Sequence, residues 1–64
     1  MSDDEMIRVY MTAAGMIMED LSPKVILGPY SPELFGELRQ AARTLEKIAD
    51  VAEAIERVKA SRGR

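Results

Sequence analysis

Cysteine, histidine and tryptophan are absent from this 64-residue chain. Their absence excludes disulfides and zinc sites of the usual kind, and it removes the side chains that most often serve as general bases and nucleophiles. Two groups of carboxylates lie where helices are predicted to begin, and there capping and the helix dipole account for them: Asp3, Asp4 and Glu5, and Glu33 and Glu37. Glu19 and Asp20 lie at the predicted end of the first helix, where we expect them to be solvated. We therefore expect a protein that is not an enzyme and that holds neither a metal nor a cofactor.

Long hydrophobic runs are absent too. The most apolar stretch, Met6 to Met18, is interrupted by Arg8, Thr12 and Gly15, and it is shorter than the roughly 20 residues that span a bilayer. The first residues are acidic, whereas a secretory signal begins with basic residues and an apolar run. The net charge of −2 favours neither nucleic acid nor an anionic membrane. These features predict a cytoplasmic protein without membrane contact.

Small size sets the next constraint. One core in a chain of 64 residues supplies only about 3–5 kcal/mol, and neither a disulfide nor a zinc ion can add to it here. Long helices and self-association are the sources of stability that remain.

A heptad repeat runs through the second half of the chain. Apolar residues recur at alternating steps of four and three, and we call this set the seam: Leu34, Leu38, Ala41, Leu45, Ile48, Ala52 and Ile55. A lone amphipathic helix cannot shield such a stripe from water. The seam therefore predicts packing against partner helices.

The first 20 residues favour a helix over about 3–20. Ser2 as N-cap and Glu5 three residues later form a capping box. Only one narrow stripe of this helix is polar, at Arg8, Thr12, Gly15 and Glu19. A helix that is apolar around most of its circumference must be buried on more than one side, which one partner helix cannot achieve. Residues 6–13 also alternate as a half-buried strand would, and this alternative stays open.

A longer helix is predicted over about 32–61, after a loop at about 21–31. Pro23 and the pair Gly28-Pro29 break helices, while Ser31-Pro32 supplies an N-cap followed by proline at the first helical position. The longer helix should overhang the first by several turns. The part of the seam from Ile48 onward then needs cover from outside the hairpin, and residues 62–64 should form a frayed basic tail.

Together these elements predict an all-α fold in a single domain, residues 1–64: an antiparallel hairpin of a short and a long helix that assembles into a homo-oligomeric bundle. The interface between copies would be formed by Met6, Tyr10, Met16, Ile17, Leu38, Leu45, Ile48, Ala52 and Ile55. This shape, with a long second helix opening at Ser-Pro-Glu, resembles the small helical co-chaperones and needle subunits of bacterial secretion systems, without a shared motif.

The predicted loop offers a contact surface for another protein. Its apolar residues are Val25, Ile26, Leu27 and Tyr30. They either meet a partner or cap the core of the hairpin. The predicted first helix is rich in methionine, which recurs on surfaces that accept partners. The function we expect is that of a small adaptor or assembly protein that acts by helix packing and self-association.

Two other functions stay open. Arg39, Arg43 and Lys47 form a basic stripe at steps of four, and Arg62 and Arg64 lie in the tail. A dimeric regulator could bind nucleic-acid phosphates with this surface, although the acidic first half would repel them. The third function is a structural subunit of a filament or shell, which requires head-to-tail contacts instead of closed ones.

Overall fold

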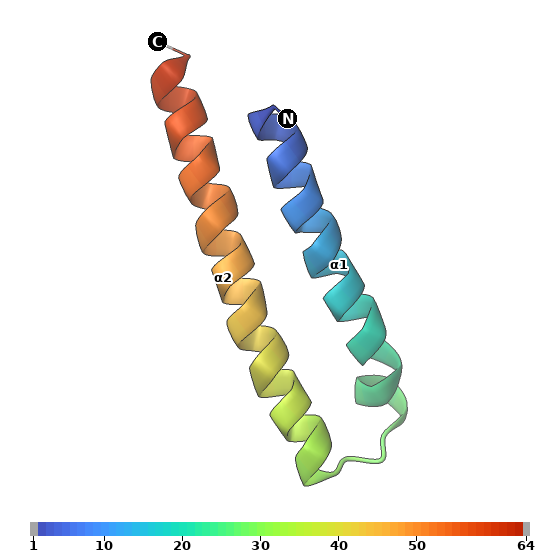
Figure 1. The fold of residues 1–64 in the computed structure, drawn as a ribbon. Coiled ribbons are helices and arrows are strands. Elements are labelled where there is room, and N and C mark those ends of the chain that lie inside the picture. Colours follow the sequence, from blue (N-terminus) through green and yellow to red (C-terminus); the bar gives the residue numbers. More distant parts are fainter. Residues whose placement is uncertain (1, 64) are drawn as a thin grey trace.

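The structure, a computed structural model that describes residues 2–63, consists of two antiparallel helices (Figure 1). Helix α1 spans Asp3–Leu27 and α2 spans Pro32–Arg62. The hairpin is a rod of 51 × 15 × 15 Å, and its radius of gyration of 15.1 Å exceeds the value of about 11 Å typical of a compact domain of this length. The predicted all-α hairpin is confirmed, and residues 6–13 are helical. Within residues 2–63, neither helix has a stretch that is long and apolar enough to cross a bilayer.

Both helices begin where the sequence predicts. The hydroxyl oxygen of Ser2 accepts a hydrogen bond from the Glu5 amide at 3.2 Å, and that of Ser31 accepts one from the Leu34 amide at 3.3 Å. Each serine thus satisfies an amide that has no partner within its own helix. Pro32 occupies the first position of α2, where its missing N–H removes no hydrogen bond.

The predicted end of the first helix is wrong. Helix α1 continues through Pro23 to Leu27, seven residues past the predicted end, so most of the predicted 21–31 loop is helical. A proline inside a helix removes one hydrogen bond and crowds the preceding turn, and the axis of α1 shifts aside before its last turn (Figure 1). The displaced last turn survives because its carbonyls find donors beyond the helix.

Those donors lie in the short loop. The Gly28 amide donates to the Lys24 carbonyl at 2.9 Å, and the Tyr30 hydroxyl donates to the Ile26 carbonyl at 3.2 Å. Gly28 has a φ of 74°, a left-handed conformation that glycine adopts without steric cost. Only residues 28–31 connect the helices, which is an ordinary length between antiparallel neighbours.

The seam faces α1 along its whole length. Leu34, Ile48 and Ala52 are buried, and its other four members are half-buried. The predicted overhang is therefore wrong in extent, because the longer α1 covers Ile48 and Ala52. The opposing surface of α1 has its own heptad pattern, at Ile7, Tyr10, Ala14, Ile17 and Leu21.

The end of α2 also differs from the prediction. Arg62 is helical instead of frayed, and its guanidinium pairs with the Asp3 carboxylate at 2.8 Å. Gly63 closes the helix by donating its amide hydrogen to the Lys59 carbonyl at 3.0 Å. Arg64, the last residue of the predicted tail, lies outside the described residues.

Candidate helix-packing surfaces

The hairpin leaves much apolar surface exposed. Its accessible surface of 5140 Å² exceeds by about 1,000 Å² the roughly 4,100 Å² typical of a folded protein of 7.1 kDa. Within residues 2–63, only Ala14, Leu34, Ile48 and Ala52 are buried. Large apolar side chains that stay exposed are Val9, Met11, Met16, Met18, Val25, Ile26, Leu27, Tyr30, Phe35, Val51 and Val58. One helix pair therefore cannot bury the apolar residues that this sequence carries.

A groove of about 340 Å³ lies on one side of the hairpin, along the junction of the two helices. We call it the apolar groove, and its lining is Met18, Leu21, Ser22, Val25, Ile26, Leu38, Ala41, Ala42 and Leu45. Ser22 is the one polar side chain in this lining. Alanines form much of its α2 wall, and methionine and valine project from α1. A hydrophobic side chain from another helix could enter this groove without displacing a charged group.

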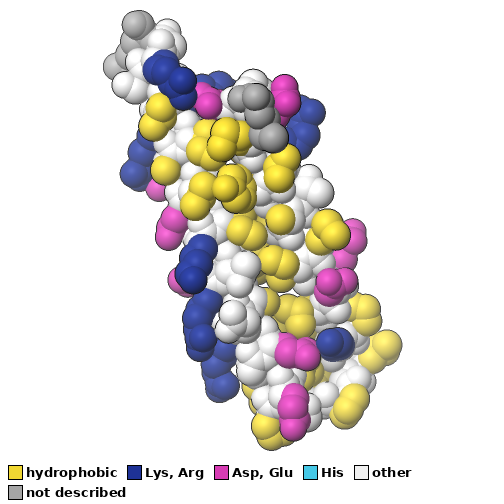
Figure 2. Space-filling model, in the orientation of Figure 1, with side chains coloured by type: hydrophobic (Ala, Val, Ile, Leu, Met, Phe, Trp, Pro, Cys, Tyr) yellow, Lys and Arg dark blue, Asp and Glu magenta, His cyan; other side chains and the backbone are white. Residues whose placement is uncertain are grey.

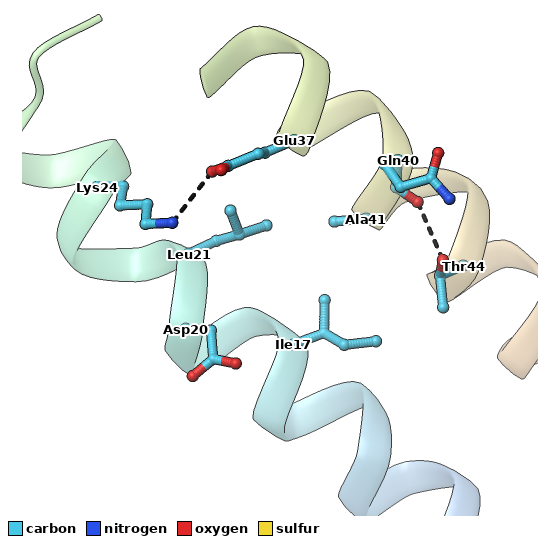
Figure 3. Close-up of a pocket in the computed structure, with 8 residues that line it drawn as sticks. All are labelled: Ile17, Asp20, Leu21, Lys24, Glu37, Gln40, Ala41 and Thr44. Carbon is cyan, nitrogen blue, oxygen red and sulfur yellow. Dashed lines mark hydrogen bonds and ion pairs between the residues drawn. The ribbon is translucent and has the colours of Figure 1, made fainter. Parts of the chain in front are cut away.

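A polar groove of about 330 Å³ lies on the other side (Figure 3). Its lining is Ile17, Asp20, Leu21, Lys24, Glu37, Gln40, Ala41 and Thr44. Lys24 on α1 reaches across to Glu37 on α2, with 3.2 Å between the ammonium nitrogen and the carboxylate oxygen. The Thr44 hydroxyl donates to the Gln40 carbonyl of its own helix at 3.1 Å. Leu21 and Ala41 line both grooves, so at this level the hairpin is a single layer with two open sides.

A third groove, of about 310 Å³, lies near the chain ends. We call it the terminal groove, and its lining is Asp3, Met6, Val51, Ala54, Ile55, Val58 and Arg62. Glu37, Thr44, Val51 and Val58 are seven residues apart in turn, so the polar and terminal grooves share one side of α2. Figure 2 shows hydrophobic side chains along the helix junction towards the chain ends and charged groups nearer the loop.

Ion pairs close the hairpin at its open end. Lys59 pairs with Asp4 and lies 3.9 Å from Glu56, while Arg62 pairs with Asp3. The hydrogen bond from Lys59 to Asp4, together with the negative charges of Asp4 and Glu56, raises the pKa of the Lys59 ammonium above its usual value. Because all of these groups except the half-buried Asp3 are exposed, the pairs fix the register of the helices more than they stabilise the fold.

The residues predicted to join copies do not share one surface. Ile48 and Ala52 are buried within the hairpin itself, and Met16 is 61% exposed. The other six are half-buried, and all but Met6 belong to the two facing heptads: Met6, Tyr10, Ile17, Leu38, Leu45 and Ile55. The structure therefore uses most of this set inside one chain, and whether its exposed edges also meet a second copy stays a prediction.

The predicted loop patch is helical at Val25, Ile26 and Leu27 and does not cap the core. These three side chains are 42, 69 and 80% exposed, and Tyr30 is 62% exposed. Val25 and Ile26 line the apolar groove, which joins the patch to a larger apolar surface. The methionines of the first helix were predicted as part of a partner surface, but the seven-residue spacing that aligns Met11 and Met18 with Val25 was not recognised from the sequence.

The basic stripe runs along the side of α2 that faces away from α1. Arg39, Arg43 and Lys47 are exposed, and within residues 2–63 none of them forms an ion pair. Figure 2 shows positive side chains along this outer edge. Arg62 forms an ion pair with Asp3 on the other helix, so it is not part of the stripe.

No family model, curated protein or solved structure matches this chain. Within residues 2–63, no three acidic side chains come close enough together to hold a metal ion. The features that bear on function are thus the grooves, the exposed apolar side chains and the basic stripe.

Proposed function

We propose that this chain is a small, non-catalytic adaptor or assembly protein that acts by packing its helices against other helices, including those of a second copy. The observation that supports this most strongly is the exposed apolar surface on both sides of a single-layer hairpin. Exposed apolar patches of this kind mark sites of protein–protein interaction. A specific interface removes about 800 Å² per partner, which is close to the excess surface of this chain.

The two open sides explain how one small chain can connect partners. A second copy on one side leaves the other side of each hairpin exposed, and the resulting pair offers two equal surfaces to another protein. The exposed last turn of α1, Val25 to Leu27, extends the surface at the loop end. The exposed methionines of α1, Met11 and Met18 among them, have flexible side chains that adapt to different partner shapes.

Mass measured by light scattering on a size-exclusion column, over a dilution series with helicity followed in parallel, tests this proposal. We expect a fixed dimer or tetramer that loses helicity as it dissociates, because a lone pair of helices has a marginal core. A fully helical monomer at every concentration would contradict the proposal. Particles that grow with concentration would instead indicate the filament subunit.

The variant Leu45→Asp sharpens this test. Leu45 is half-buried and lines the apolar groove, so a carboxylate there should dissociate or unfold the protein. Ala60→Asp adds the same charge at an exposed position of the same helix that lines none of the three grooves, and it serves as the control. Unchanged mass and melting in both variants would remove the role assigned to the seam.

The second candidate function is binding to nucleic acid, and the exposed, unpaired basic stripe is the observation that favours it. A gel mobility shift at low salt and at about 0.15 M salt tests it, because phosphate contacts weaken steeply as salt rises. Replacing Arg39 and Arg43 with glutamine should abolish such binding. Arg57→Gln is the matched control, since Arg57 is already paired with Glu53 at 2.7 Å.

A further inference from the structure

Two sets of exposed side chains follow heptad spacing beside the apolar groove. They are Met11, Met18 and Val25 on α1, and Phe35, Ala42 and Ala49 on α2. Residues seven apart occupy the same side of a helix, so each set forms a stripe along its helix. Met18, Val25 and Ala42 all line the groove, which places both stripes on the same side of the hairpin.

The antiparallel arrangement pairs the stripes in layers. If Met18 lies level with Ala42, steps of seven in opposite directions bring Met11 level with Ala49 and Val25 level with Phe35. The next layer would join Asp4 and Glu56. The ion pairs between the helices agree with this register to within one turn, since Lys24 reaches Glu37 and Lys59 reaches Asp4. The apolar surface thus has three layers and ends in a charged layer near the chain termini.

We propose that a second copy of this chain covers this surface, with the loops of both hairpins at the same end of a four-helix bundle. This proposal rests on the self-association proposed above, and it specifies which face of the hairpin is covered and how the two copies are oriented. The excess of about 1,000 Å² belongs to the whole hairpin, and a stable dimer buries about 800 Å² from each partner, so a second copy on one face would remove an area of similar size. The opposite side of the hairpin also carries the terminal groove, but a second copy that covered the whole length of that side would desolvate the ion pair of Lys24 and Glu37.

The sizes of the side chains in each layer favour one orientation of the second hairpin. With loops at the same end, the two-fold axis runs along the bundle, and α1 of one copy lies over α2 of the other. Met18 then packs on Ala42 of the second copy and Met11 on Ala49, a long side chain on a short one. With loops at opposite ends, α1 lies over α1, so methionines would crowd each other while alanines face a void.

Because the chain has no cysteine of its own, single cysteines can test this packing directly. Met18→Cys and Ala42→Cys, both at exposed positions, are mixed and oxidised, and the disulfides are identified by mass. A disulfide needs Cβ atoms about 4 Å apart. We expect the mixed disulfide between the two variants to exceed random pairing several-fold. Met16→Cys mixed with Arg39→Cys is the control, and these outward-facing positions should cross-link no more than random collision allows.

A distance measurement between spin labels at Ser61→Cys gives an independent result. In the proposed bundle the two labels lie at the same height and are separated by the bundle width, about 20 Å. With loops at opposite ends and the Met18–Ala42 layer at the centre, they would lie about 57 Å apart along the axis, at 1.5 Å per residue.

The outcomes separate this proposal from the proposed function. A monomeric mass for the unsubstituted chain would overturn both. A dimeric mass with Met18→Cys linked mainly to itself, or with labels beyond 50 Å, would overturn only the face and direction proposed above.

Discussion

Two leucines give a matched test of where the stability of this hairpin comes from. Leu34 is 5% exposed in the seam, whereas Leu27 is 80% exposed at the end of α1. Replacing either with alanine removes the same atoms. For Leu34→Ala, lost burial and a cavity together should cost about 2–4 kcal/mol. Leu27→Ala should cost less than about 0.5 kcal/mol, because most of its side chain is already in water.

The expected difference is large compared with the total stability. A core of this size supplies about 3–5 kcal/mol, so Leu34→Ala should lower the melting temperature by more than about 10 °C or leave the chain unfolded. Urea unfolding followed by circular dichroism measures both variants, at one fixed protein concentration because the proposed self-association would add to apparent stability. Equal destabilisation by the two substitutions would refute the assignment of the core to the seam.

Two further predictions concern particular residues. Gly28→Ala should destabilise the fold by about 1 kcal/mol or more, because Gly28 has a positive φ. Gly36→Ala should stabilise the fold by about 0.5–1 kcal/mol, because a methyl group at this helical position would meet no other atom. Thermal melts in which both substitutions shift the melting temperature in the same direction would contradict this. Lys59 has a raised pKa in the folded state, so its contribution is present below its unfolded pKa and is lost as pH rises through the folded value. Melting temperature should therefore fall more between pH 9 and 12 for the native chain than for Lys59→Arg, which stays charged, and identical pH profiles would refute the role of the Lys59–Asp4 pair.

Local chemistry made the helix starts predictable. Ser2 and Ser31 satisfy amide groups through contacts three residues away, so their role depends on adjacent sequence alone. The seam was predictable for the same reason, since its spacing of three and four residues is that of helices in contact. All seven of its members face α1 in the structure.

The end of α1 was not predictable from Pro23 alone. Two stop signals follow one another in this segment, and the proline is the stronger local one. The helix continues because Gly28 and Tyr30 supply donors to the last carbonyls, and the Tyr30 hydroxyl does so by folding back to Ile26. That contact depends on the path of the loop, which propensities do not encode.

The apolar groove needed the register of the two helices. The spacing of Met11, Met18 and Val25 is visible in the sequence, and so is that of Phe35, Ala42 and Ala49. Which residue of one stripe lies level with which residue of the other depends on the length of the loop. The predicted loop of eleven residues would have shifted the layers, whereas residues 28–31 fix them.

The architecture also explains why the helices close on each other so incompletely. Ala14 and Ala52 are buried because small side chains let two backbones approach closely, but such contacts bury little area. The larger seam residues Leu38, Leu45 and Ile55 are shielded by one neighbouring helix and remain half-exposed at the groove edges. Further burial would require a third and a fourth helix packed against the grooves, and residues 2–63 supply only two.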